Sequence, residues 1–194
     1  MSVQVVGGDL GGRKLDCPPG LSVRPMTARV KNAVFNILGE KVQGAKVLDL
    51  YAGSGGLGVE ALSRGAASAV FVEKDAVHAE FLRRNLESLG ISAKCRVLVQ
   101  ENRAAFRVLE KEGKSFDLIL ADPPFSRDRK VLPPEVSADL VALSASLIWK
   151  GILVLEHRGG RPSLPKGLVP TDQRDYGDAT VSWFAFRILP GSHA

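Results

Sequence analysis

Short apolar runs alternate with longer amphipathic stretches over most of the chain after residue 45. Each run has four to six residues with few polar positions, as in strands buried on both faces of a parallel sheet. The predicted strands are Val47–Leu50, Ala69–Glu73, Arg96–Val99, Phe116–Ala121 and Ile152–Glu156. The predicted helices between them are Leu57–Arg64, Ala76–Leu89, Asn102–Glu112 and Pro134–Ile148. This alternation indicates an α/β fold with helices on both faces of the sheet.

The end of the chain departs from this rhythm. Leu168–Tyr176 and Thr180–Ile188 read as two strands joined by a turn at Gly177-Asp178. Such a hairpin would add two antiparallel strands to one edge of an otherwise parallel sheet. We therefore predict a Rossmann-like, seven-stranded and mostly parallel sheet with an antiparallel C-terminal edge, in a main domain of residues 44–190.

Residues 1–43 are predicted to form an extension that precedes the main sheet. Its hairpin strands are Val3–Val6 and Arg13–Leu15. A helix follows, with Thr27 placed as its N-cap and with either Gly39 or Gly44 at its end. The extension is thus a small hairpin followed by one helix.

The composition is that of a globular chain without a membrane anchor. With 194 residues, of which 45% are hydrophobic and 24% charged, the chain can bury a sizeable core. No apolar run approaches the ~18 residues that a membrane span needs. Residues 1–14 contain no apolar signal core, so we expect no secretion.

Cysteines and histidines give no metal signature. Cys17 and Cys95 could pair, but without a C-x-x-C spacing we expect reduced thiols in a cytoplasmic protein. The histidines lie far apart without a cysteine cluster, so we expect no metal site. We place His78 on a solvated helix face and His157 near the edge of the sheet.

Positive charge is the feature of the composition that points to a partner. The net charge is +5 and the pI about 9.4. A solvated basic surface would explain this, but clustering favours a polyanion, because grouped cations release counterions from phosphates. The first cluster is Arg13, Lys14, Arg24, Arg29 and Lys31, and the second is Arg127, Arg129 and Lys130.

A glycine-rich loop follows the first strand of the main sheet. Gly53, Gly55 and Gly58 satisfy G-x-G-x-x-G between a predicted strand and a predicted helix. Glycines let the backbone approach a ligand closely, and the helix start offers unpaired N–H groups. About 20 residues later, Glu73 ends the second strand, where an acid can bind the ribose hydroxyls of an adenosine-type cofactor. This pattern alone fits NAD and S-adenosylmethionine equally.

The tetrapeptide Asp122-Pro-Pro-Phe125 follows the fourth strand, at the sheet edge where open α/β sheets bind ligands. The Asp122 carboxylate can accept a hydrogen bond from an amine. Pro123 and Pro124 fix the backbone carbonyls, which supply a second acceptor. Phe125 can stack on a planar base. Two acceptors on one exocyclic amine free its lone pair for attack on a methyl group held in line.

A rigid turn is the alternative for this tetrapeptide, with Asp122 capping a helix and Phe125 filling core. Its position after the fourth strand, downstream of the glycine-rich loop and Glu73, favours the chemical interpretation.

The chain resembles the RsmD-type guanine-N2 methyltransferases of bacterial small-subunit ribosomal RNA, a family of class I S-adenosylmethionine-dependent methyltransferases. The resemblance covers the whole chain with similar spacing, and its N-terminal and glycine-loop segments are the most specific. The matching segments are Val5–Leu15, Arg24–Lys31 with Phe35–Leu38, Leu48–Gly65 and Asp122–Phe125.

The resemblance implies a role for each matching residue. Residues framing the methionine end of the cofactor would be Asp49, Gly53, Ser54 and Gly55. Glu73 would hold the ribose, with Lys74 at the adenine edge. Asn102 would contact the adenine amine, although many relatives in the wider class have Asp there. The guanine would be held by Asp122, Pro123 and Phe125, with Asp122 also beside the cofactor. Residues gripping RNA would be Arg13, Lys14, Arg24, Arg29 and Arg127.

The sequence thus predicts a monomeric enzyme that methylates a guanine amine of 16S ribosomal RNA or of the small ribosomal subunit. The target base must be unpaired or swung out of its stack. Other amino acceptors remain open, such as adenine N6 in DNA or RNA or a protein amide. A catalytically silent rRNA-binding assembly factor is the alternative of another class. An NAD-dependent dehydrogenase fits less well, because a second dinucleotide-binding half is missing.

Overall fold

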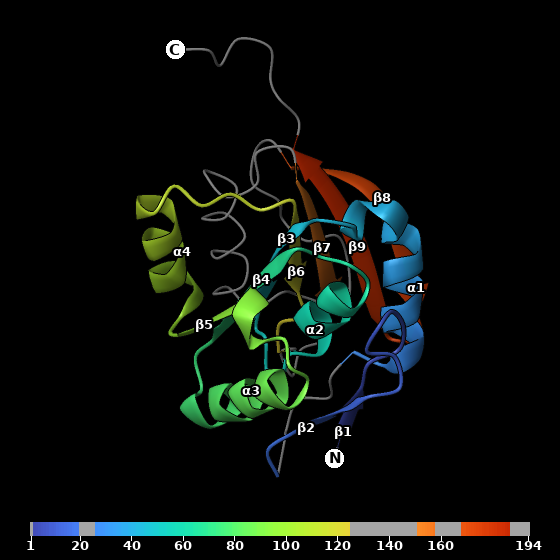
Figure 1. The fold of residues 1–194 in the computed structure, drawn as a ribbon. Coiled ribbons are helices and arrows are strands. Elements are labelled where there is room, and N and C mark those ends of the chain that lie inside the picture. Colours follow the sequence, from blue (N-terminus) through green and yellow to red (C-terminus); the bar gives the residue numbers. More distant parts are fainter. Residues whose placement is uncertain (1, 20–25, 125–150, 158–167, 187–194) are drawn as a thin grey trace.

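One seven-stranded sheet forms the centre of the computed structural model, which describes residues 2–19, 26–124, 151–157 and 168–186 (Figure 1). Its strands are β3 (Lys46–Leu50), β4 (Ser68–Glu73), β5 (Cys95–Val99), β6 (Leu118–Ala121), β7 (Ile152–His157), β8 (Leu168–Tyr176) and β9 (Ala179–Phe186). They lie in the order β5-β4-β3-β6-β7-β9-β8. Strands β3 to β7 are parallel, and β9 runs antiparallel to both β7 and β8. The predicted sheet is confirmed, including its antiparallel edge.

Helices cover both faces of this sheet. They are α1 (Ala28–Leu38), α2 (Gly56–Ser63), α3 (Ala76–Ser88) and α4 (Asn102–Lys111), with short 3-10 turns at Gly39–Val42 and Ser92–Lys94. Alternate residues of each strand point to opposite faces, so β3 sends Val47 to one core and Leu48 to the other. Buried residues of α1, α2 and α3 belong to the first core, while Phe106 and Leu109 of α4 belong to the second.

The N-terminal hairpin and helix form as the sequence predicts, with small shifts of their ends. Strand β1 (Ser2–Gln4) pairs with β2 (Lys14–Asp16) in antiparallel register. Helix α1 begins after Thr27, whose side chain accepts a hydrogen bond from Val30 N at 3.3 Å, and it ends at Gly39. Because Val5, Leu15 and Val34 lie in the same core as the main sheet, the extension packs as part of one molecule.

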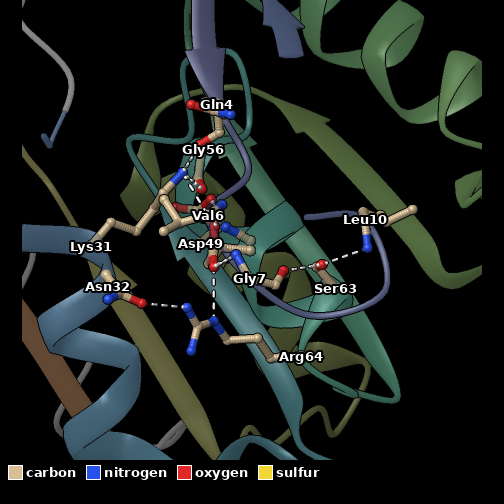
Figure 2. A network of polar contacts seen from close by, with 12 residues as sticks. Gln4, Val6, Gly7, Leu10, Lys31, Asn32, Asp49, Gly56, Ser63 and Arg64 are labelled. Atoms are coloured by element: carbon tan, nitrogen blue, oxygen red, sulfur yellow. Dashed lines mark hydrogen bonds and ion pairs between the residues drawn. The ribbon is translucent and has the colours of Figure 1, made fainter. Parts of the chain in front are cut away.

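A buried polar network fastens the hairpin to α1 and α2 (Figure 2). The carboxylate of Glu60 accepts from Val6 N at 2.7 Å and from Gly7 N at 2.9 Å. Lys31 of α1 lies 3.4 Å from this carboxylate and donates to Gln4 O at 2.6 Å. These contacts join segments more than 25 residues apart in sequence, so three separate elements share one buried anion.

The same network continues at the C-terminal end of α2, through Ser63 and Arg64. Arg64 donates to Glu60 Oε1 at 2.8 Å and to Asn32 Oδ1 at 3.0 Å, and its guanidinium lies over the ring of Phe35. Ser63 receives a hydrogen bond from Leu10 N at 2.9 Å (Figure 2). Helix α2 is thereby bonded to the hairpin along one side and to α1 along another.

Two basic residues are buried. His157, expected just after the fifth strand, is the last residue of β7 and is fully buried, because β7 lies between β6 and β9. Its Nε2 lies 2.9 Å from Ser182 Oγ on the neighbouring strand. Lys31, counted with the exposed basic cluster, is only 1% exposed and faces Glu60.

The predicted helix Pro134–Ile148 lies outside the described residues. Within the part of the chain that the structure describes, no helix is long and apolar enough to cross a membrane.

Candidate active site

The glycine-rich loop between β3 and α2 uses its glycines for different purposes. Gly53 has a φ of +55°, and a Cβ placed on it would meet nothing within 4 Å, so this backbone faces open space. A Cβ on Gly55, whose φ is +94°, would lie 2.6 Å from Leu82. On Gly58 it would lie 2.3 Å from Phe71. Gly53 is thus the position where a ligand can approach, while Gly55 allows close packing against α3 and Gly58 close packing of α2 on β4.

Tyr51 opens this loop in a left-handed conformation, with a φ of +60°, that side chains other than glycine rarely adopt. Among the described residues it is the one non-glycine position with a positive φ. Such geometry costs of order 1 kcal/mol and tends to occur at functional sites. The residue type gives no hint of it, so sequence reasoning missed it.

Glu73 lies at the carboxyl end of β4 and braces the loop through both carboxylate oxygens. Oε2 accepts from Gly53 N at 2.7 Å, and Oε1 accepts from Asp75 N at 2.9 Å. The side chain is largely buried. The sequence places this acid at the end of the second strand, and the structure brings it into direct contact with the open part of the loop.

Asp49 lies on β3 beneath the loop and is almost fully buried. Its Oδ2 accepts from Gly58 N at 2.7 Å, which ties the strand to the first turn of α2. Burial raises the pKa of Asp49 to about 8, because desolvation outweighs this hydrogen bond. The nearby carboxylates of Asp122 and Glu73 raise the pKa further, whereas Lys31 opposes them. Three carboxyl groups therefore share one electrostatic environment.

Asp122 follows β6 directly, beside the loop that follows β3. Because Leu50 of β3 pairs with Ala121 of β6, both segments leave the sheet at the same edge. Oδ2 of Asp122 accepts a hydrogen bond from Met26 N at 3.1 Å. The extension therefore reaches the Asp-Pro-Pro motif, through a backbone group that carries no sequence signal.

The remaining residues of the motif differ in exposure. Pro123 is buried and Pro124 exposed, while Phe125 lies outside the described residues.

Ser54 is buried within the loop and receives contacts from two directions. Asn85 of α3 donates through Nδ2 to Ser54 O at 3.1 Å. Cys17, just beyond β2, has its Sγ 3.4 Å from Ser54 Oγ. Neither Asn85 nor Cys17 belongs to a recognisable motif. A polar residue among the apolar positions of α3, Ala79, Leu82 and Leu86, is the signal that could have revealed Asn85.

Two predicted adenine-edge residues lie after neighbouring strands. Lys74 follows β4 and is exposed, with its Nζ 3.6 Å from Glu101 Oε1. Asn102 is the buried first residue of α4, just after β5. Gln100 N donates to Glu73 O at 3.1 Å, which holds these two strand ends together. The loops that carry Glu73, Lys74 and Asn102 therefore meet at one edge of the sheet.

The predicted RNA-contacting residues lie partly on the described surface. Arg13 and Lys14 are exposed on the hairpin, and Arg29 is exposed on α1. Lys31 points inward, and burial lowers its pKa despite the opposing effect of Glu60. Arg24, Arg127, Arg129 and Lys130 lie outside the described residues.

The model of the family described as "Conserved hypothetical protein 95" matches residues 3–185. "Putative rRNA methyltransferase YlbH" of Bacillus subtilis (strain 168) is 33% identical over 187 residues, which is 95% of this chain and 100% of that relative.

"Ribosomal RNA small subunit methyltransferase D" of Escherichia coli (strain K12) is 39% identical over 125 residues. This match covers 64% of this chain and 61% of that relative, less than two thirds of its length. The solved structure of "Putative methyltransferase yhhF from Escherichia coli" superposes with a TM-score of 0.80 at 30% identity, covering 96% of this chain and 98% of the other.

Proposed function

The chain belongs to the RsmD-like family whose model covers residues 3–185, and we propose that it methylates the exocyclic N2 amine of a guanine in small-subunit ribosomal RNA. As a member of this family it is a methyltransferase that depends on S-adenosylmethionine. The proposal adds the acceptor atom, the type of base and the residues that act.

One observation carries the proposal: Asp122 and the open Gly53 backbone lie at the same sheet edge, after strands β6 and β3 that pair with each other. We assign the loop of Tyr51 to Gly55, with Asp49 beneath it, to the methionine end of the cofactor. Glu73 is assigned to the ribose. An acceptor held at Asp122 would then face the donor across adjacent strands, as a direct displacement requires.

S-adenosylmethionine supplies an electrophilic methyl group on a positively charged sulfur. In the proposed reaction the Asp122 carboxylate and the carbonyl of the Asp-Pro-Pro turn accept the hydrogens of the guanine amine, which keeps its lone pair available. The new N–C bond forms as the C–S bond breaks, and the C–S electron pair leaves with the sulfur. The resulting ammonium loses one proton, to Asp122 or to water. The carboxylate of Glu73 would favour binding of the cationic donor over its neutral product.

The acceptor is tested by methyl transfer from labelled S-adenosylmethionine. Small ribosomal subunits, protein-free 16S RNA and duplex DNA are offered in parallel, and the labelled nucleoside is identified. We expect N2-methylguanosine at one site of the ribosomal RNA. Label in adenine would refute the guanine assignment while leaving the cofactor site intact. Cofactor binding without any transfer would favour a catalytically silent rRNA-binding protein.

A further inference from the structure

Asn85 is a buried carboxamide that bonds entirely outside its own helix. It is 3% exposed on α3, among the apolar residues that pack this helix on the sheet. A buried amide without partners costs free energy, so its hydrogen bonds account for its presence there. Its side chain bonds to backbone atoms of two other segments, at Asp16 and Ser54.

One side of the Asn85 carboxamide holds the end of the hairpin. Oδ1 accepts from Asp16 N at 2.9 Å, and Nδ2 donates to Asp16 O at 3.0 Å. The side chain therefore pairs with one residue of β2 as a neighbouring strand would, and Figure 1 shows the hairpin beside α3. The same β2 carries Lys14, with Arg13 just before it, and both are exposed.

The other side of the carboxamide holds the glycine-rich loop. Nδ2 also donates to Ser54 O at 3.1 Å. This carbonyl belongs to the Ser54–Gly55 peptide, whose N–H donates to Ala52 O at 2.8 Å. The peptide is therefore fixed on both sides, between Gly53 and Gly55, which both have positive φ. Without the Asn85 bond, the conformational freedom of Gly55 would let this peptide rotate.

We propose that Asn85 is a positioning residue that holds the glycine-rich loop in the shape that binds S-adenosylmethionine and links this loop to the N-terminal hairpin. The inference rests on the proposed assignment of this loop to the methionine end of the cofactor. Under this proposal the hairpin would bind RNA and also influence the loop. Arg13 and Lys14 lie just before Asp16, and two hydrogen bonds of Asn85 connect Asp16 to Ser54 in the loop.

The first test measures S-adenosylmethionine binding to the full chain by calorimetry. Asn85→Asp keeps the shape and the Oδ1 acceptor but replaces the Nδ2 donor with an oxygen that faces two carbonyls. Asn85→Ala removes all three side-chain hydrogen bonds. We expect the Kd for S-adenosylmethionine to rise about tenfold or more in each variant, since losing a buried hydrogen bond costs about 1–3 kcal/mol and 1.4 kcal/mol is a factor of ten.

Two controls separate positioning from general destabilisation. Phe184→Leu loosens the opposite core on β9, and Ser88→Ala removes a hydroxyl whose bond goes to Asn85 O within α3. Both should bind S-adenosylmethionine as the wild type does. In the Asn85 variants, kcat at saturating S-adenosylmethionine should stay within about twofold while KM rises, because the loss is in ground-state binding. A folded Asn85 variant with wild-type cofactor affinity would overturn the proposal.

The link to the hairpin is tested by adding protein-free 16S RNA. In the wild type, RNA should change the affinity for S-adenosylmethionine, and by reciprocity the cofactor should change the affinity for RNA by the same factor. This coupling should be lost in Asn85→Ala, and its survival there would refute the link. Calorimetry with the cofactor alone needs no acceptor, so it decides the role of Asn85 even if guanine proves to be the wrong base.

Discussion

At the scale of single residues, the candidate site contains three carboxyl groups whose surroundings differ. Asp49 is buried under α2, Glu73 bonds to the glycine-rich loop, and Asp122 lies half-buried at the carboxyl end of β6. Each is held by a backbone N–H, from Gly58, Gly53 and Met26 respectively. Backbone donors set the direction of each carboxylate.

Replacing Asp122 by Asn should separate chemistry from cofactor binding. The amide oxygen can still accept from Met26 N, but the variant loses the charge that the acceptor amine would meet. We expect methyl transfer to fall about 10²-fold or more, by analogy with the loss of one oriented polar group, while the Kd for S-adenosylmethionine changes little. Asp117→Asn is the control, because Asp117 lies before the amino end of the same strand and bonds to Lys46 N. An equal loss of cofactor affinity in folded Asp122→Asn would contradict the assignment.

Asp49 should make stability depend on pH. Its folded pKa of about 8 exceeds the ordinary value of 3.8, so the folded protein holds this proton more tightly than the unfolded chain. The free energy of unfolding should therefore fall as pH rises from about 4 to 8. Asp49→Asn removes this dependence and should be more stable than the wild type at pH 8.5 by on the order of a few kcal/mol.

Urea unfolding of both proteins between pH 4.5 and 8.5 measures the difference. Asp9→Asn serves as the control, because Asp9 is exposed on the hairpin. Parallel stability profiles for the wild type and Asp49→Asn would show that Asp49 is already ionised in the folded protein.

At the scale of elements, the hairpin, α1 and α2 depend on Glu60. Its carboxylate is fully buried and bonds to two hairpin amides, to Lys31 and to Arg64. Removing one partner of a buried ion pair leaves the other charge without compensation, which usually costs about 3–5 kcal/mol.

Glu60→Gln should accordingly destabilise the protein by about 3–5 kcal/mol in urea unfolding. The double variant Lys31→Met, Glu60→Gln should recover part of this loss, because no buried cation remains opposite the amide. Glu80→Gln breaks an exposed pair with Arg84 at the same i,i+4 spacing and should cost less than about 0.5 kcal/mol. Equal effects at Glu60 and Glu80 would mean that burial of the network contributes nothing.

Elements were more predictable than the bonds between them. Apolar runs identify the strands, the caps at Thr27 and Gly39 fix α1, and the position of Glu73 after the second strand places it at the site. The amide of Met26 could not be foreseen, since every residue but proline carries one. The burial of Lys31 was not predicted, because lysines are usually exposed and this one is buried against Glu60, which lies 29 positions later.

At the scale of the whole molecule, exposed cations lie on several elements, and the extension contributes three of them. Arg13 and Lys14 lie on the hairpin and Arg29 near the start of α1. Under the proposed function, these three residues would bind phosphates on the side of the molecule where Met26 contacts Asp122.

RNA binding should weaken steeply as salt rises, because each neutralised phosphate releases counterions. Arg13→Ala and Arg29→Ala should each reduce the slope of log K against log salt by about 1. Arg107→Ala, an exposed arginine on α4, is the matched control and should leave the slope unchanged. Titrations of 16S RNA at several salt concentrations measure this, and a slope that neither variant alters would remove the extension from the binding surface.

The fastening of the hairpin has a consequence for how the chain is made. During synthesis the hairpin precedes Glu60 and Asn85, to which Val6 and Asp16 bond, by more than 50 residues. The hydrogen bond from Met26 N to Asp122 spans a still larger separation, 96 positions along the chain. Contacts so distant in sequence form late, since the intervening chain must be closed first. The extension should therefore be among the last segments to reach its folded position, and the candidate site should be complete only after the extension has docked on Glu60, Asn85 and Asp122.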